Sequence, residues 1–383
     1  MPRLCLLTTS PMSLDVLNRG MLEAIRERGY DITGLSGPEP AVSVANVRER
    51  GFKVVTIPFE REPSPLKDLW CLLRLWWMMV VHRFDVIHCS TPKAMLLGTL
   101  AARLSFHLNV VTVFRGRAYE NSTGFKRKCY ILLDKLVARL SSRVVVVSKS
   151  LRRAMLADGI GDERRLVVIG DGASRGIDSE IYYPGVISQD LVARFREKYG
   201  LGDDPIALFV GRVRQDKGVN EMVSAFLMLS KQHQHWRLVI AGPEESVGVI
   251  QPEIVKAIDE HPRIHAIGSI ADPREAYAAA SFLVLPTYRE GFPNVPLEAA
   301  AMGLAVITTD AIGAVDSVLH EQTGLIVSAQ KVEPLAEAMG RLMADDEERN
   351  AMGQAGMAWV KTAFDPKRIQ EGMIQILDEM VTR

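Results

Sequence analysis

The stretch of sequence that decides the fold is Phe282-Leu-Val-Leu-Pro286, followed closely by Tyr288-Arg-Glu290-Gly-Phe-Pro-Asn-Val-Pro-Leu-Glu298-Ala299. The first run is short and apolar and predicts a buried β-strand, and the second leads through a loop into a helix that stops at Gly303. A strand that passes through a short loop into a helix is the repeating unit of doubly wound α/β folds.

The same alternation occupies both halves of the chain. Short apolar runs lie between helical patterns at Leu4–Thr8, Asp85–Cys89 and Asn109–Phe114, and the alternation restarts at Ala207–Val210 after turn residues cluster at 182–185 and 200–205. Strands that are apolar throughout are typical of a parallel sheet covered on both faces. We therefore expect two doubly wound Rossmann-like domains, 1–185 and 186–365, that face each other across a cleft, followed by a C-terminal helix, 366–383.

Composition restricts the class of protein, and charge adds a clue about partners. The 383 residues are 48% hydrophobic and 24% charged, which excludes a disordered, collagen-like or coiled-coil chain. Basic and acidic residues balance at 46 each, but residues 1–190 hold 27 basic and 19 acidic side chains. Within 61–153 the counts are 17 and five. The first half is therefore expected to face an anionic partner.

The cysteines and the apolar runs indicate the compartment. The four cysteines are widely spaced without a C-x-x-C pair, which favours reduced core residues over disulfides or a zinc site: Cys5, Cys71, Cys89 and Cys129. The apolar run at the N-terminus is too short for a signal peptide, and no stretch reaches the length of a membrane-spanning helix. A cytoplasmic location is expected.

The loop after Pro286 carries the residues that best fit a ligand site. Glu290 follows the carboxyl end of the strand, which is the general ligand position of doubly wound folds. Gly291 allows close approach of the backbone, and Asn294 is a candidate N-cap whose helix offers free N–H groups to an anion. Glu298 lies about one turn into the helix, within reach of a sugar diol. Two solvated glutamates in a proline-rich turn are the alternative, and the strand–loop–helix context favours the ligand site.

Glu290 and Glu298, with seven residues between them, resemble the paired-glutamate motif of family 4 of the retaining glycosyltransferases, which have the GT-B fold. Further segments resemble that family in the expected order: Leu208-Phe-Val-Gly-Arg212-Val-Arg-Gln-Asp-Lys217-Gly218, Val239-Ile-Ala-Gly242-Pro243, and 313–327 ending in Gln-Thr-Gly324-Leu-Ile-Val. The similarity is close over about 205–345 and looser in the first half. The order and spacing of these motifs make it specific.

The resemblance implies that 1–185 binds the acceptor, that 186–365 binds the nucleotide-sugar donor, and that the helix 366–383 packs back on the N-terminal domain. It further implies a metal-independent, retaining transfer of a hexosyl or N-acetylhexosaminyl group from the nucleotide-sugar, expected to be a UDP-sugar, without a cofactor. Arg212 and Lys217 would hold the donor diphosphate in place of a metal, and the spacing of a Walker loop is absent. With Glu290 on the donor sugar, these are the expected catalytic residues. Glu298 would contact the nucleotide ribose. The remaining expected donor-binding residues are Gly291, Phe292, Pro293, Asn294, Val295, Gly211 and Gly242.

The first half departs from the family pattern at two places. Many members have a glycine-rich loop after the first strand, where this chain has Thr9-Ser-Pro-Met-Ser13-Leu14. Many have a histidine where this chain has Phe114-Arg115-Gly-Arg117, which leaves the acceptor-side base open. The acceptor-side candidates are therefore Arg115, Arg117, His88 and Ser13, with a purely structural role as the alternative for His88. Segments at 119–128, 147–151 and 172–178 resemble members that build cell-surface polysaccharides on a polyprenyl diphosphate.

The segment Asp68-Leu-Trp70-Cys-Leu-Leu-Arg-Leu-Trp76-Trp77-Met-Met-Val-Val-His-Arg83 holds three of the five tryptophans. Tryptophan, arginine and long apolar side chains on one helix suit the interface of an anionic membrane. An ordinary buried helix is the alternative, and the basic window around the segment favours peripheral membrane contact. The resemblance implies that the acceptor is a lipid-linked saccharide, and the enzyme is therefore expected at the inner face of the cell membrane.

Two other functions fit parts of the sequence. A sugar-nucleotide epimerase shares the two-domain fold, but the spacing of Glu290 and Glu298 does not favour it. A non-catalytic nucleic-acid-binding protein would suit the basic half, but aromatic residues do not alternate with the basic ones as stacking on bases requires, so no nucleic acid is expected.

Overall fold

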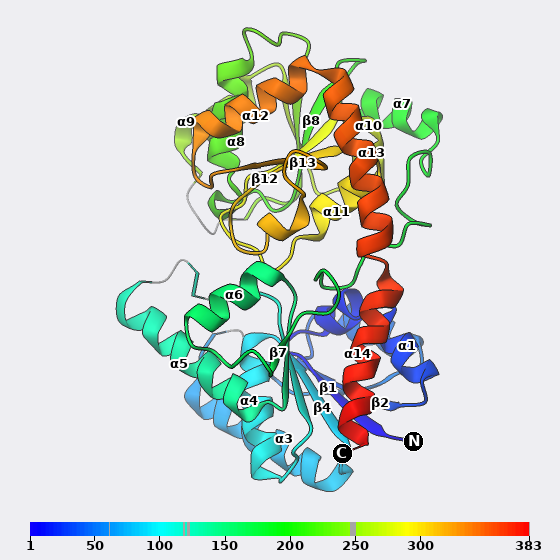
Figure 1. Cartoon of the computed structure of the whole chain (residues 1–383), viewed down its shortest axis with the longest axis vertical. Coiled ribbons are helices and arrows are strands. Elements are labelled where there is room, and N and C mark those ends of the chain that lie inside the picture. The colour runs from blue at the N-terminus through cyan, green and yellow to red at the C-terminus, as the bar shows by residue number, and fades with distance from the viewer. Residues whose placement is uncertain (61, 118, 121–122, 246–249, 383) are drawn as a thin grey trace. The chain divides into compact units, whose positions relative to one another are not determined.

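The computed structural model describes residues 1–383 apart from 61, 118, 121–122, 246–249 and 383, and the chain forms two compact units (Figure 1). Unit 1 comprises residues 1–175 and 366–383, and unit 2 comprises residues 176–365. The division falls earlier than the turn residues at 182–185 indicate. The N–H of Ile177 donates to the carbonyl of Phe364 at 2.8 Å, a contact that ties this segment to unit 2.

Unit 1 contains a seven-stranded sheet in which every neighbouring pair is parallel. The strand order is β3-β2-β1-β4-β5-β6-β7, so the direction in which the chain adds strands reverses between β1 and β4. Strands β4 and β5 are buried along their whole length, as a central parallel strand requires. The strands are β1 (Arg3–Leu7), β2 (Asp31–Ser36), β3 (Lys53–Thr56), β4 (Val86–Ser90), β5 (Val110–Phe114), β6 (Arg143–Val146) and β7 (Leu166–Val167).

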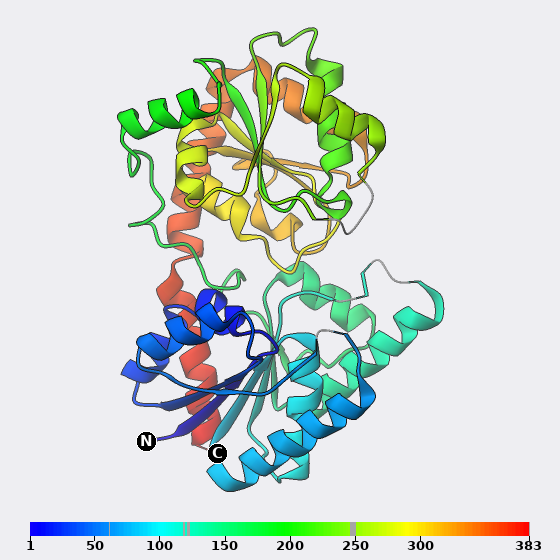
Figure 2. The ribbon, with the colours of Figure 1, turned by 180° about the vertical axis from the view of Figure 1, so that it is seen from behind.

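Helices cover both faces of this sheet. The helices are α1 (Met21–Glu27), α2 (Ala41–Glu49), α3 (Pro65–His82), α4 (Pro92–Leu104), α5 (Gly124–Leu140), α6 (Lys149–Ala157) and α14 (Pro366–Val381). Helices α3, α4 and α5 pack side by side, whereas α1 packs beside α14 on the other face (Figures 1 and 2). The last helix of the chain thus completes unit 1. Helix α2 was not predicted, because its short segment has only a weak helical pattern of apolar residues and lies between two stronger strand signals.

The first helical segment of unit 1 is divided in two. A π-helical turn, η1 (Ser13–Leu17), comes first, and α1 begins only at Met21. Gly20 separates them with φ of 78°, a left-handed conformation that costs glycine little. The side chain of Asn18 donates to the carbonyl of Ser13 at 2.6 Å and satisfies an acceptor at the interruption.

Unit 2 contains a six-stranded parallel sheet in the order β10-β9-β8-β11-β12-β13. Its strands are β8 (Ile206–Val210), β9 (Arg237–Ala241), β10 (Ile264–Gly268), β11 (Phe282–Leu285), β12 (Ala305–Thr309) and β13 (Gly324–Val327). Its helices are α7 (Gln189–Lys198), α8 (Val219–Leu229), α9 (Pro252–Glu260), α10 (Pro273–Ala279), α11 (Asn294–Ala301), α12 (Val332–Ala344) and α13 (Asp346–Ala363), with short 3-10 turns η2 (Gln215–Lys217) and η3 (Val315–Ser317). The predicted class, two doubly wound α/β domains, is confirmed.

The order of the strands in unit 2 decides where its ligand site lies. Strands β8 and β11 are direct neighbours at the centre of the sheet, although about 70 residues separate them along the chain. Because parallel strands end at the same edge, the loop after β8 meets the loop after β11. Within the described residues, no helix is both long and apolar enough to cross a membrane.

Candidate functional site

The two central loops of unit 2 are tied to each other by backbone hydrogen bonds. The carbonyl of Asp216, in η2 after β8, accepts from the N–H of Tyr288 at 3.0 Å and from Oγ1 of Thr287 at 3.2 Å. Both donors lie directly after β11. Residues 212–217 and 287–290 therefore form one surface at the carboxyl edge of the sheet.

Lys217 and Glu290 form an ion pair at this edge, with Nζ donating to Oε1. The two side chains are only 15% and 16% exposed, so each charge has lost much of its water and depends on the other. The N–H of Glu290 donates to the carbonyl of Ile312 at 3.0 Å, which fixes the loop that carries the carboxylate. The structure thus brings together two of the residues expected to be catalytic.

Arg212 lies nearby in the loop after β8 but pairs with a different carboxylate. Its Nη1 is 3.2 Å from Oε2 of Glu245, and Nη1 of Arg214 is 3.0 Å from the same oxygen. Arg214 also contacts Asp216, with Nε 3.1 Å from Oδ1. The cations of this edge are therefore neutralised by carboxylates of the protein, which an incoming diphosphate would have to replace.

Glycines at this edge let backbone segments approach more closely than any side chain allows. A Cβ at Gly242 would lie 1.8 Å from the carbonyl oxygen of Gly211. A Cβ at Gly313, where φ is 81°, would lie 2.5 Å from the carbonyl oxygens of Glu290 and Gly291. Gly211 and Gly242 therefore hold the loops after β8 and β9 together, and Gly313 supports the loop that carries Glu290.

The start of α11 differs from the expectation in one detail. Asn294 was expected to be the N-cap, but it is the first helical residue, Pro293 precedes it as the cap, and no side chain caps the helix. Proline can take this position because the cap residue has the extended backbone that proline favours, with φ of −76°. Oδ1 of Asn294 is buried without a hydrogen-bond partner among the described residues. The N–H groups of Asn294 and Val295 lie in the first turn, where helices leave donors free.

Phe292 and Glu298 reach the interior rather than the surface. The ring of Phe292 is buried and its centroid lies 5.5 Å from that of Phe364, so only its backbone is available to a ligand. Glu298 is 6% exposed, and its Oε2 accepts from the hydroxyl of Tyr277 in α10 at 3.0 Å. Tyr277 could not be assigned this role from the sequence, since it lies 21 residues before Glu298 in another helix.

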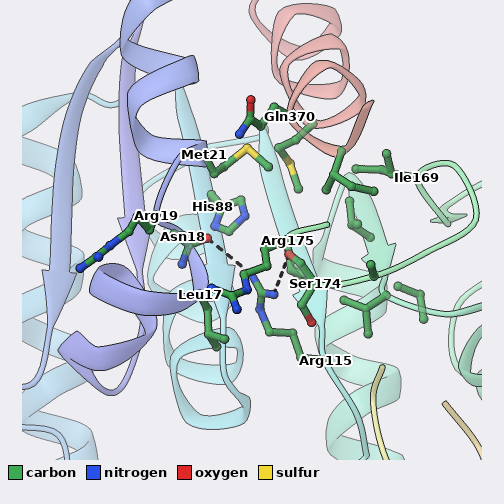
Figure 3. A pocket seen from close by; sticks show the side chains of 17 residues that line it. Leu17, Asn18, Arg19, Met21, His88, Arg115, Ile169, Ser174, Arg175 and Gln370 are labelled. Carbon is green, nitrogen blue, oxygen red and sulfur yellow. Dashed lines mark hydrogen bonds between the residues drawn. The ribbon is translucent and has the colours of Figure 1, made fainter. Parts of the chain in front are cut away.

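Unit 1 has a pocket of its own, between η1, the central strands, the segment after β7 and α14 (Figure 3). The cavity measures about 30 Å³ and brings together two of the acceptor-side candidates, His88 and Arg115. Arg115 follows β5, and its guanidinium donates to the carbonyl of Ser174 at 3.2 Å and to Oδ1 of Asn18 at 3.4 Å. Burial lowers the pKa of Arg115 to about 10, so it stays charged at neutral pH.

His88 is a neutral base in this pocket. Its side chain, on β4, is 3% exposed, and Nδ1 is buried without a hydrogen-bond partner among the described residues. Burial, and then the positive charge of Arg115, lower the pKa of His88 to about 4. At neutral pH the pocket therefore carries the charge of Arg115 beside an uncharged imidazole.

The other two acceptor-side candidates lie outside the pocket. Arg117 donates to Glu120 at 2.6 Å and to Asp158 at 2.7 Å, and this network anchors the loop after β5. Ser13 is buried in η1. Other lining residues were not among the expected site residues, for example Asn18, Ser174 and Gln370, because they come from segments far apart in the chain.

Comparisons with known proteins bear on the family and on the fold. Residues 192–359 match the family "Glycosyl transferases group 1", and residues 16–172 match "Glycosyl transferase 4-like domain". The chain is 28% identical over 362 residues to the "Capsular polysaccharide biosynthesis glycosyltransferase CapM" of Staphylococcus aureus, covering 93% of this chain and 91% of that one. It is 25% identical over 313 residues to the "UDP-Gal:alpha-D-GlcNAc-diphosphoundecaprenol alpha-1,3-galactosyltransferase" of Escherichia coli, covering 80% and 77%.

The solved structures establish the fold. The crystal structure of HepE from Anabaena in complex with UDP and glucose superposes with a TM-score of 0.79 at 17% sequence identity, covering 99% of this chain and 100% of that one. The two domain matches together span most of the chain, and their boundary agrees with the two units of the structure. The resemblance seen in the sequence is thereby confirmed: the chain is an enzyme that belongs to the glycosyltransferases, with the GT-B fold and a glycosyltransferase 4-like domain joined to a group 1 domain.

Proposed function

We propose that this enzyme is a retaining, metal-independent glycosyltransferase that moves a sugar from a UDP-sugar to a lipid-linked saccharide at the inner face of the cell membrane. The product would belong to a capsule, lipopolysaccharide or related glycan. The observation that carries the proposal is the pairing of Lys217 with Glu290 at the carboxyl ends of two adjacent central strands.

The charges at this edge suit a nucleotide diphosphate. Lys217 and Arg212 would exchange their carboxylate partners for phosphate oxygens and stabilise the charge that develops as the diphosphate leaves. Release of Lys217 would free Glu290 to bind hydroxyls of the donor sugar. Glu298, already oriented by Tyr277, would bind the ribose. A UDP donor is supported by the E. coli relative, whose name specifies UDP-Gal, and by the complex of HepE with UDP and glucose.

The proposed reaction needs no nucleophile from the protein. The bond between the sugar's anomeric carbon and the diphosphate oxygen breaks, and the acceptor hydroxyl attacks from the same face. Its proton passes to an oxygen of the leaving diphosphate. The protein contributes orientation of the two substrates and stabilisation of the diphosphate charge, which are the large terms in such a transfer.

A lipid-linked acceptor requires the enzyme to work at a membrane surface, and α3 has the side chains for it. The helix buries Cys71, Leu75, Met78 and Met79 against the rest of unit 1. Its other side exposes an apolar face. We call this the tryptophan face of α3; it consists of Leu66, Leu69, Trp70, Leu73, Trp76, Trp77, Val80 and Val81. Exposed tryptophan and leucine beside basic residues is the pattern of an interfacial helix on an anionic membrane.

Donor binding tests the proposal directly, because the chain offers a matched control. Lys256 and Glu260 form a second lysine–glutamate pair in unit 2, but both are exposed and lie on α9. We expect Lys217→Met to weaken UDP binding roughly tenfold or more, as loss of a charge-assisted contact of about 1.5–3 kcal/mol predicts. Lys256→Met should bind UDP like the wild type. Isothermal titration calorimetry with UDP, GDP and their sugars measures both.

Two results would contradict the proposal. One is equal UDP affinity in Lys217→Met and Lys256→Met, which would remove the diphosphate from this edge. The other is interconversion of free UDP-sugars without an acceptor, which would identify an epimerase instead.

A further inference from the structure

Arg115 is a partly buried cation without a counter-ion. Among the described residues its guanidinium has two hydrogen bonds, to a carbonyl and to an amide oxygen, and it forms no ion pair. Its Nε is buried and has no acceptor. A guanidinium has five N–H donors, so donors remain free in a place where water has little access.

The neighbouring arginine shows that this arrangement is particular to one position. Arg117 follows two residues later, its side chain is 8% exposed, and it is neutralised by both Glu120 and Asp158. Burying a charge is costly unless it is paired, and the fold provides that pairing for Arg117 only. No carboxylate among the described residues therefore compensates the desolvation of Arg115. A cation buried in this way favours the binding of an anion.

The rest of the pocket is also suited to an anion. The described residues that line it include Arg19, Arg115 and Arg175 and no aspartate or glutamate. Arg19 is engaged by Asp15 at 2.9 Å and points away from the other labelled side chains, whereas Arg175 lies beside Arg115 (Figure 3). His88 adds a neutral ring, and Asn18, Ser174 and Gln370 add polar groups.

The size of the pocket limits what can enter it. A cavity of about 30 Å³ has room for about two water molecules. The non-bridging oxygens of a phosphate linkage can enter such a space, but a sugar ring cannot. Arginine is also the side chain that best matches the geometry of phosphate oxygens.

We propose that the pocket around Arg115 binds a phosphate group of the acceptor, so that unit 1 recognises the charged linkage of the acceptor rather than its sugar. This inference rests on the proposed function, because it takes the acceptor to be a saccharide joined to lipid through phosphate. The free N–H donors of Arg115 would point at the phosphate oxygens, with Asn18 and Ser174 holding the guanidinium in position.

Binding of inorganic phosphate and pyrophosphate tests the pocket without any assumption about the reaction. The variants are Arg115→Gln and, as a control with the same loss of charge, Arg164→Gln at an exposed position of unit 1. All unfolding measurements are made with saturating UDP, so that the diphosphate-binding edge of unit 2 is already occupied. We then expect pyrophosphate to raise the thermal unfolding midpoint of the wild type and of Arg164→Gln, since a ligand that binds only the folded state stabilises it. Pyrophosphate should leave the unfolding midpoint of Arg115→Gln unchanged. UDP affinity, measured by calorimetry, should be equal in all three proteins and shows that unit 2 stays folded.

The source of the phosphate is tested by kinetics with two acceptors that carry the same saccharide, one linked through diphosphate to a short lipid and one through a neutral alkyl ether. We expect Arg115→Gln to raise the KM of the diphosphate acceptor about tenfold and to leave the KM of the neutral acceptor unchanged. Arg115→Lys, which keeps the charge, should recover part of the loss.

Three outcomes overturn the inference. Equal stabilisation of wild type and Arg115→Gln by pyrophosphate, or none in either, removes the anion site. A loss of UDP affinity in Arg115→Gln assigns the pocket to the donor. An equal rise in KM for both acceptors makes Arg115 a structural residue. Absence of transfer with every donor would contradict the proposed function, whereas the pyrophosphate result would still stand.

Discussion

The cationic side chains of this enzyme differ in whether a carboxylate neutralises their charge. Lys217 is held by Glu290, and Arg117 is held by Glu120 and Asp158, whereas Arg115 has no carboxylate partner among the described residues. A paired cation can exchange its carboxylate partner for a substrate phosphate, whereas an unpaired cation has no carboxylate to release. The first arrangement favours reversible binding of a leaving diphosphate, and the second favours recognition of a fixed phosphate.

His88 provides a pH test at the residue scale. Its pKa of about 4 lies below the ordinary value of 6.5, so its contribution to stability is complete above pH 6.5 and is lost as pH falls from 6.5 to 4. At pH 5 the loss is about 2 kcal/mol, from about 1.4 kcal/mol per pH unit. We expect His88→Gln to flatten the dependence of the unfolding free energy between pH 7 and pH 5.

The control for this test is His235→Gln, which removes an exposed histidine of unit 2. Asp134 also titrates in the same range, because burial raises its pKa to about 7 against the opposing effect of Arg117, but it is present in every variant compared. A steep pH dependence that persists in His88→Gln, or an NMR titration of the His88 imidazole near pH 6.5, would contradict the account.

The sequence predicted the residues of unit 2 better than those of unit 1, for a physical reason. Glu290 and Lys217 belong to loops at the ends of strands, and the apolar pattern locates strand ends well. The hydrogen bond between Glu298 and Tyr277, and the meeting of Asn18, Ser174 and Gln370 around Arg115, depend on tertiary packing of distant segments. No local pattern encodes such packing. The N-cap was misassigned to Asn294 because asparagine is a preferred cap, whereas the chain places Pro293 there.

At the scale of secondary-structure elements, strand alternation predicted both sheets apart from the edge strand β13, and the other errors concern helices. Gly20 divides the first helix because its left-handed backbone lies between η1 and α1, and an isolated glycine in a helical pattern does not reveal this beforehand. Helix α3 was predicted with two alternatives, a membrane-interface helix and a buried one. The structure shows a buried side and an exposed apolar side on the same helix.

The tryptophan face of α3 leads to a prediction about membranes. Trp77 is 61% exposed and Leu73 is 55% exposed, so both can enter a bilayer interface without disturbing the core. We expect the double substitution Leu73→Gln and Trp77→Gln to lower binding to vesicles containing phosphatidylglycerol at least tenfold, since each buried apolar side chain contributes about 1.5–3 kcal/mol. Co-sedimentation measures the bound fraction.

The control is Met228→Gln, which replaces an exposed apolar side chain of α8 in unit 2. It should bind vesicles like the wild type, and binding should fall for all proteins when phosphatidylcholine replaces the anionic lipid. Equal binding by the double variant and the wild type would show that α3 does not contact the membrane.

At the scale of the whole molecule, the balanced total charge conceals two different surfaces. Unit 1 contains most of the basic excess between residues 61 and 153, together with the tryptophan face and the Arg115 pocket. Unit 2 carries the loops that suit a nucleotide-sugar. The turn residues predict the division of the chain only approximately. Residues 176–185 belong to unit 2, and one contact that holds them there, the hydrogen bond from Ile177 to Phe364, joins residues far apart in the chain.

The central claim, that the pairing of Lys217 and Glu290 marks the site of glycosyl transfer, is tested most directly by the initial rate of sugar transfer from a UDP-sugar to a polyprenyl-diphosphate-linked saccharide. Glu290→Gln is compared with Glu260→Gln, which alters the exposed pair on α9 in the same way. We predict that Glu290→Gln lowers kcat at least a hundredfold, about 2.7 kcal/mol in the barrier, while Glu260→Gln keeps the wild-type rate. Equal rates in the two variants would contradict the account.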